Sequence, residues 1–170
     1  YIYLKRFDKA ILDARKAIEL DPKSAKPYYK LAQAYMSEGN LPEAFNVLGA
    51  GLVNSPNDPN MRREHDTVQI LIGYRANLDK LIEEKDYPEA LKKALSVLEK
   101  CENDFEILCK TIELYGRTND LQAARRLLNS RQDFIRSRSP SKYVILDAQV
   151  ERFSNKIDEA RTILQNGART

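Results

Sequence analysis

The chain has few of the residues that build catalytic and metal centres. Its 170 residues include one histidine, two cysteines, six glycines and no tryptophan. We find no nucleophile–base–orienter set, no glycine-rich phosphate loop and no metal-ligand spacing. His65 has no carboxylate or cysteine at ligand spacing, so we expect a solvated surface side chain. We therefore expect no enzyme activity, no cofactor and no metal site in this chain.

An excess of one charge and long apolar runs are also missing. The 28 basic residues are interleaved with 25 acidic ones, and a net charge of +3 argues against a nucleic-acid partner. No apolar run approaches the roughly 18 residues of a membrane span, and no secretory signal pattern is present. We therefore expect no membrane partner. Because the chain starts at Tyr1 rather than methionine, we also expect it to be a fragment of a longer protein.

The two cysteines, Cys101 and Cys109, stand eight residues apart without metal-ligand spacing around them. We expect both to be reduced thiols that are largely buried. Reduced thiols favour a reducing compartment.

An internal repeat is the strongest feature of the sequence. Five short segments begin with an apolar or aromatic residue and end with alanine, and those alanines stand 34, 46, 34 and 36 residues apart. The segments are FDKA at 7–10, LPEA at 41–44, YPEA at 87–90, LQAA at 121–124 and IDEA at 157–160. A repeat of this length predicts stacked supersecondary units rather than one globular core.

The 34-residue spacing resembles that of the tetratricopeptide repeat. The second unit is most similar, with Tyr28, Leu31, Ala32 and Tyr35 where that family has Trp, Leu, Gly and Tyr on its first helix. In the first unit, Tyr1 is interpreted as the last aromatic residue of a truncated first helix. Small residues at Ala10, Ala44 and Ala90 are expected to let paired helices approach closely. The resemblance implies an all-α, right-handed superhelix of antiparallel helix pairs.

Local signals predict where helices begin and end. Ser24 is expected to cap the first helix of the second unit, with Pro27 in its first turn, and Gly39-Asn40 is expected to end it. Within RSRSPSK, residues 136–142, we expect a loop followed by a helix that Ser139 caps and Pro140 begins. Phosphorylation of Ser137 or Ser139, or contact with nucleic acid, is the alternative interpretation of this segment.

The 46-residue spacing predicts one long helix. Residues 60–86 contain no proline and only one glycine, and twelve extra helical residues add about 18 Å. We therefore predict three parts: the C-terminal end of a first repeat array at 1–59, a connecting helix at 60–86, and a second, degenerate array at 87–170. The connecting helix would also serve as the first helix of the next repeat.

Two lysines at a helix start carry the functional prediction. Lys26 and Lys30 lie one turn apart, where the positive helix end and their mutual repulsion disfavour both charges. The first helix of each tetratricopeptide unit lines the concave surface, and Tyr29 and Gln33 are expected on the same surface. The unit resembles the last repeat of chaperone-binding tetratricopeptide domains. Those domains use two basic residues at these positions to hold the C-terminal carboxylates of heat-shock proteins 70 and 90, whose tails end Glu-Glu-Val-Asp.

The resemblance implies a carboxylate clamp made by Lys26 and Lys30, with Tyr29 and Gln33 at the groove periphery. Lys30 lacks the bidentate fork that arginine offers to a carboxylate. The other clamp residues of the family, a lysine and two asparagines, would precede Tyr1. The alternative interpretation is that both lysines are ordinary solvated residues.

The order of parts resembles the tetratricopeptide J-domain co-chaperones. Their J domain carries His-Pro-Asp, whereas His65 is followed by Asp66, so the resemblance implies a J domain beyond Thr170. It also implies a non-enzymatic co-chaperone of the cytoplasm or nucleus rather than the endoplasmic-reticulum lumen, with unfolded client proteins as further partners. The alternative is a structural scaffold subunit of another assembly, without carboxylate recognition.

Overall fold

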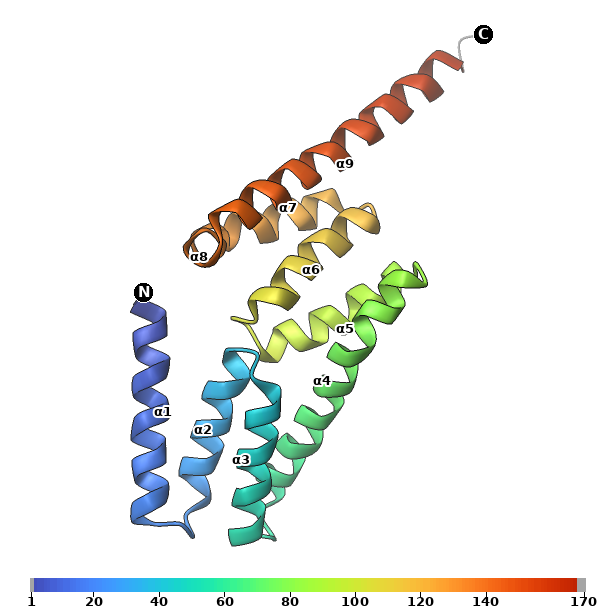
Figure 1. The fold of residues 1–170 in the computed structure, drawn as a ribbon. Coiled ribbons are helices and arrows are strands. Elements are labelled where there is room, and N and C mark those ends of the chain that lie inside the picture. The colour runs from blue at the N-terminus through green and yellow to red at the C-terminus, as the bar shows by residue number, and fades with distance from the viewer. Residues whose placement is uncertain (1, 168–170) are drawn as a thin grey trace.

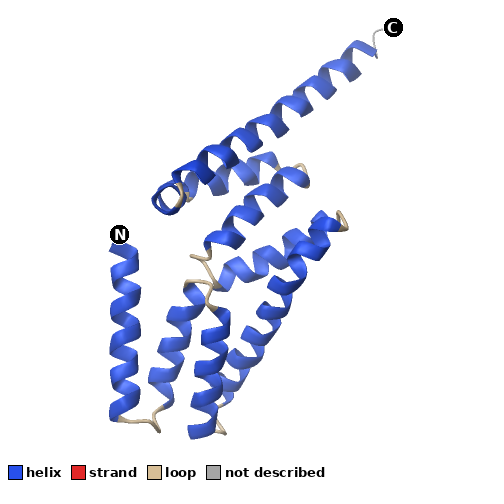
Figure 2. Cartoon of the chain, viewed as in Figure 1, coloured by secondary structure: helices blue, strands red, loops and turns tan. Residues whose placement is uncertain are grey.

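A computed structural model describes the backbone of residues 2–167 and the side chains of residues 8–154. The described backbone folds into nine helices and no strand, joined by short loops and turns (Figures 1 and 2). The helices are α1 (Ile2–Leu20), α2 (Ala25–Ser37), α3 (Leu41–Asn54), α4 (Pro59–Glu83), α5 (Tyr87–Lys100), α6 (Phe105–Arg117), α7 (Leu121–Ser130), α8 (Gln132–Arg138) and α9 (Pro140–Gly167). From α1 to α7, each helix packs mainly on its neighbours along the chain, which is the arrangement of a helical solenoid, whereas α9 packs on α6, α7 and α8.

Three antiparallel pairs, α2–α3, α4–α5 and α6–α7, follow the predicted repeat. The segments that begin at Leu41, Tyr87 and Leu121 each start the second helix of a pair. Their alanines, Ala44, Ala90 and Ala124, are completely buried. The prediction that small residues allow close helix approach is therefore confirmed at Ala44 and Ala90, and Ala124 has the same burial.

The turn inside each pair has the same backbone geometry. Gly39, Lys85 and Asn119 have φ angles of +81°, +62° and +67°, and each precedes the repeated alanine by five residues. In this conformation the amide of the left-handed residue and the amide of the next residue both donate to carbonyls in the last turn of the first helix. Glycine favours this conformation, and it stands only in the first of these turns. Asparagine tolerates the conformation in the third turn, and lysine adopts it in the second at a cost of about 1 kcal/mol.

The first repeat differs from its prediction. α1 is continuous from Ile2 to Leu20, so the segment FDKA lies inside a helix rather than at a helix start. No glycine, proline or asparagine interrupts it. Ala10 is exposed, whereas Ala14 is the residue of α1 that lies in the buried core, so the expected close helix approach at Ala10 is wrong. Tyr1 lies outside the described residues.

The long helix is present as predicted, with slightly different ends. α4 begins at Pro59, one residue before the predicted start, because the Asp58 carboxylate accepts hydrogen bonds from the amides of Asn60 (3.0 Å) and Met61 (2.9 Å). It ends at Glu83, three residues early, because the left-handed turn at Lys85 stops it. α4 packs against both α3 and α5, and one buried cluster continues from Ala14 to Leu114. The division of the chain into two arrays at α4 stays a prediction.

The C-terminal part departs further from a repeat. A second buried cluster joins α6, α7, α8 and α9. Residues 136–138 end α8, so the expected loop there is wrong, whereas Ser139 caps α9 by accepting from the Lys142 amide (3.3 Å) and Pro140 is its first residue. α9 then runs unbroken to Gly167, because no glycine or proline stands between Pro140 and that residue to stop it. The described backbone, which ends at residue 167, therefore does not form the predicted fifth helix–turn–helix unit, and the side chain of Ala160 lies outside the described residues.

Candidate peptide-binding site

The predicted site residues lie on α2. Tyr28, Leu31, Ala32 and Tyr35 are buried where α2 packs against α1 and α3. Lys26, Lys30 and Gln33 are exposed and follow one another at helical spacing, so they form a single stripe. The Lys30 ammonium group donates to the Gln33 side-chain oxygen across 3.4 Å. Tyr29 lies beside the stripe and is half-buried.

The stripe leads toward the start of α6. Ser37 is the next residue of the stripe, and its carbonyl accepts from the Asn103 amide at 2.9 Å. The Asn103 side-chain nitrogen also donates to the Ser37 hydroxyl at 3.1 Å. Asn103 immediately precedes the cap of α6, and Figure 1 shows the end of α2 meeting the start of α6. The exposed stripe therefore ends at the contact between the second and fourth units.

The N-terminus of α2 has little to offset its positive end. Ser24 occupies the cap position, as predicted, but its side chain makes no capping hydrogen bond, and the first turn has no acidic residue. The four helices α4 to α7 differ, because each has an aspartate cap whose carboxylate accepts a backbone N–H; these caps are Asp58, Asp86, Asp104 and Asp120. Among the described residues, no carboxylate lies within 4.0 Å of the Lys26 or Lys30 ammonium group.

Two lysines of later helices are already paired with carboxylates. The Lys110 ammonium group lies 2.7 Å from Asp79 of α4 and 2.9 Å from Glu106 of its own helix. Partial burial alone would lower the pKa of Lys110, but hydrogen bonds to these two carboxylates raise it. On α9, Lys142 lies 2.9 Å from Glu113. These ion pairs join α4, α6 and α9, and they occupy charges that a ligand would otherwise use.

A buried carboxylate connects three units and was not foreseen from the sequence. The Arg75 guanidinium donates to the Asp104 side chain (2.6 Å), to the Gly39 carbonyl (2.9 Å) and to Glu106 (2.9 Å). The side chain of Asp104 is only 3% exposed and also caps α6 through the Ile107 amide (3.2 Å). Burial raises the pKa of Asp104, although that amide and Arg75 lower it. An aspartate before a helix predicts a cap, but no sequence signal pairs it with an arginine 29 residues earlier.

His65 is not a solvated surface residue, and that prediction is wrong. Its ring stacks on Phe45 with centroids 4.1 Å apart, and its side chain is 21% exposed. The packing of α4 on α3 brings the two rings together. No group of three or more histidine, cysteine or acidic side chains in the described part of the chain is arranged to hold a metal ion.

The prediction for the two cysteines is confirmed, because both are free and buried. Burial raises the pKa of Cys101 to about 12 and that of Cys109 to about 11. Both thiols are therefore protonated and unreactive at neutral pH.

The helices α1, α2 and α3, with α2 packed between the other two, have the packing expected of the family that the sequence resembles. Residues 1–63 match the tetratricopeptide repeat family. The match covers α1 to α3 and the start of α4, and it includes both lysines. No curated protein matched the chain. Of the described helices, none has an apolar stretch that is long enough to cross a membrane.

The tetratricopeptide match and the repeated helix pairs make the fold a tetratricopeptide-type helical solenoid, as the sequence predicted. Beyond residue 63, α4–α5 and α6–α7 keep the same left-handed turn and buried alanine. Tetratricopeptide repeats are protein–protein interaction modules and are generally non-enzymatic. The coarse function is therefore the binding of a protein partner.

Proposed function

We propose that this chain is the peptide-binding part of a co-chaperone and holds the acidic C-terminal tail of heat-shock protein 70 or 90. One observation carries the proposal. Lys26 and Lys30 expose two ammonium groups one turn apart at the start of a helix, where the first turn has no acidic residue and the described residues provide no carboxylate partner. Such a placement is locally unfavourable, and a carboxylate ligand would make it favourable. Residues that break a local rule in this way often belong to functional sites.

The chemistry of the site is charge pairing. A C-terminal aspartate presents a main-chain and a side-chain carboxylate, and Lys26 and Lys30 would each hold one of them. Upstream residues of the tail would follow the stripe past Gln33 toward Ser37, with Tyr29 at its edge. An exposed ion pair contributes about 0.5–1 kcal/mol, so two lysines account for roughly a tenfold gain in affinity. We therefore expect weak binding by this chain alone.

The wider co-chaperone assignment rests on the resemblance described above. It includes a J domain beyond Thr170, location in the cytoplasm or nucleus, and contact with unfolded clients along the helices that follow α4. The free, buried thiols of Cys101 and Cys109 agree with a reducing compartment.

A scaffold subunit without carboxylate recognition is the second candidate, and one observation favours it. Two cationic residues of α4 and α6 bind carboxylates of the neighbouring unit, as in the Arg75–Glu106 and Lys110–Asp79 pairs. Internal pairing of this kind fixes the angle between successive units and takes up two charges that a peptide would otherwise use. A scaffold would not depend on Lys26 or Lys30.

The two candidates are separated by titrating the isotope-labelled chain with a peptide ending in Glu-Glu-Val-Asp, followed by nuclear magnetic resonance. We expect amide shifts in residues 24–37 and a dissociation constant that rises with salt. Lys26→Ala with Lys30→Ala should weaken binding about tenfold, as should amidation of the peptide's C-terminus. Lys92→Ala with Lys100→Ala, a change of equal charge at exposed positions of α5, is the control and should have no effect.

Absence of shifts at α2, or equal losses in both double variants, would favour the scaffold and remove the clamp. Circular dichroism of each variant at 222 nm should match that of the parent chain, so that a loss of binding is not mistaken for a loss of fold.

A further inference from the structure

The basic charge of the chain is concentrated at its C-terminal third. Residues 121–146 contain six basic residues and one acidic residue, a net charge of +5, whereas the whole chain sums to +3. The remaining residues are therefore slightly acidic. This segment includes α7, α8 and the start of α9, away from the α2 lysines in sequence. Two of the six basic residues, Arg125 and Lys142, are already ion-paired with carboxylates of α9 and α6, so the four remaining arginines of the segment are the charges that suit an anionic partner.

Three arginines at α8 form what we call the α8 arginine cluster: Arg131, Arg136 and Arg138. Two of them lie on one aromatic ring, with guanidinium carbons 4.9 Å (Arg131) and 5.4 Å (Arg138) from the centroid of Phe134. Arg136 lies 4.1 Å from the centroid of Tyr143. Stacking holds a guanidinium group in place while its N–H fork stays available for a planar anion.

Arg131 has a structural role as well. It donates to the Glu102 carbonyl and, at 3.0 Å, to the Asn103 side-chain oxygen, so it ties the start of α8 to the loop before α6. Arg136 and Arg138 are exposed. In the described part of the chain, neither of these two has a carboxylate within 4.0 Å, and Asp133 on the same helix pairs with none of the cluster. The cluster therefore has two guanidinium groups free for a ligand.

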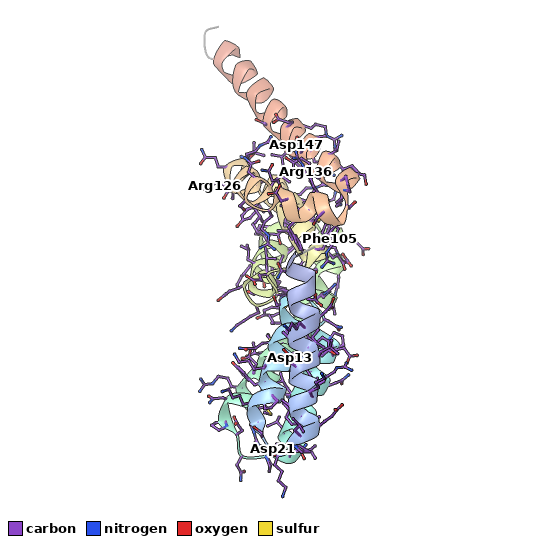
Figure 3. The ribbon with its side chains drawn as sticks, turned by 90° about the vertical axis from the view of Figure 1, so that its left-hand side faces the viewer. Asp13, Asp21, Phe105, Arg126, Arg136 and Asp147 are labelled. Carbon is purple, nitrogen blue, oxygen red and sulfur yellow. The ribbon has the colours of Figure 1, made fainter. Side chains whose placement is uncertain are left out.

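Figure 3 looks onto the face of the molecule that carries α8. Arg136 lies above Phe105 in this view, and Arg126 and Asp147 lie in the same upper region. The Phe105 and Phe134 rings meet edge to face with centroids 6.4 Å apart. The Phe134 ring is thus already engaged by Phe105 and two arginines, and Tyr143 is engaged by Arg136 and buried, which leaves little aromatic surface on which a nucleic-acid base could stack.

We propose that the α8 arginine cluster binds an acidic peptide segment of a protein partner, at a site separate from the α2 lysines. Charge complementarity selects carboxylates, and the stacked guanidinium forks suit bidentate binding of them. A nucleic acid fits less well, because the cluster spans one short helix and the rest of the chain is slightly acidic and repels a long polyanion. This inference does not depend on the proposed chaperone-tail site.

The test uses the whole chain and a fluorescein-labelled decapeptide of glutamate and aspartate with an amidated C-terminus. The amidated C-terminus removes the main-chain carboxylate that the α2 lysines are proposed to hold. Fluorescence anisotropy should show saturable binding, and Arg136→Ala with Arg138→Ala should weaken it about tenfold. Arg136→Lys with Arg138→Lys keeps the charge but not the fork, and it should weaken binding about threefold.

Two controls make the result specific to α8. Arg62→Ala with Arg63→Ala removes the same charge from exposed positions of α4 and should leave the affinity unchanged. Lys26→Ala with Lys30→Ala should also leave it unchanged. Equal losses at α4 and α8, or full retention of affinity in the Lys variant, would overturn recognition by the stacked arginines. Tighter binding of a single-stranded RNA of equal charge, lost in the α8 Ala variant, would show that the partner class is wrong.

Discussion

Replacing Arg75 with methionine tests whether one buried carboxylate holds the repeat units together. Arg75 bonds to Asp104, to Gly39 and to Glu106, and it thereby joins the turn after α2, α4 itself and the start of α6. Methionine keeps most of the apolar stem but removes every donor. The variant should leave the Asp104 carboxylate buried without its cationic partner.

The size of the effect follows from the burial of the two partners. Removing one member of a fully buried pair costs about 3–5 kcal/mol. The Arg75 side chain is 33% exposed while that of Asp104 is 3% exposed, so water compensates part of the loss. We expect a decrease of about 2–3 kcal/mol in the free energy of unfolding. This figure includes the cost of leaving the Gly39 carbonyl without its hydrogen-bond donor.

The pH dependence has a definite sign. Burial raises the pKa of Asp104 above 3.8, and Arg75 partly opposes this rise. Removing Arg75 raises that pKa further. A carboxyl group whose folded pKa is raised loses stability as the pH increases through the interval between its unfolded and folded pKa values. The cost of Arg75→Met should therefore be full at pH 7 and should shrink as the pH falls toward 3.8.

Urea unfolding followed by circular dichroism measures the effect. Asp104→Asn removes the charge but keeps a good helix cap, so the double variant should cost at least about 1 kcal/mol less than the sum of the single variants. A cost for Arg75→Met below about 0.5 kcal/mol, or one that is additive and independent of pH, would refute the role of this pair.

Two further predictions concern the glycines and the cysteines. Gly39 has a φ of +81°, and a Cβ there would meet a carboxylate at 2.5 Å, so Gly39→Ala should destabilise the chain by about 2 kcal/mol in urea unfolding. Gly73 is helical with open space around it, so Gly73→Ala should stabilise by about 0.5–1 kcal/mol, and equal effects at both sites would contradict the argument. Cys101 and Cys109 have raised pKa values of about 12 and 11, so a thiol reagent at pH 8 should modify them only in urea; rapid labelling of the folded chain would show that they are accessible.

Local signals in the sequence were sufficient for most helix boundaries. The repeated segments at Leu41, Tyr87 and Leu121 mark helix starts, and residues 60–86 correspond closely to α4. These features depend on helix propensity, capping and turn residues within a few positions of one another. The same signals misled at FDKA and IDEA, where a match to the repeat was not accompanied by a residue that ends a helix.

The sequence by itself determined that the chain is helical and repetitive, and it singled out Lys26 and Lys30, because each of these properties is readable within one helix or one period. Only the tertiary structure decided that Arg75 meets Asp104, that His65 stacks on Phe45, and which lysines are already paired with carboxylates. These contacts join side chains from different helices, and their geometry depends on how neighbouring units pack. Spacing along a single sequence does not specify that packing.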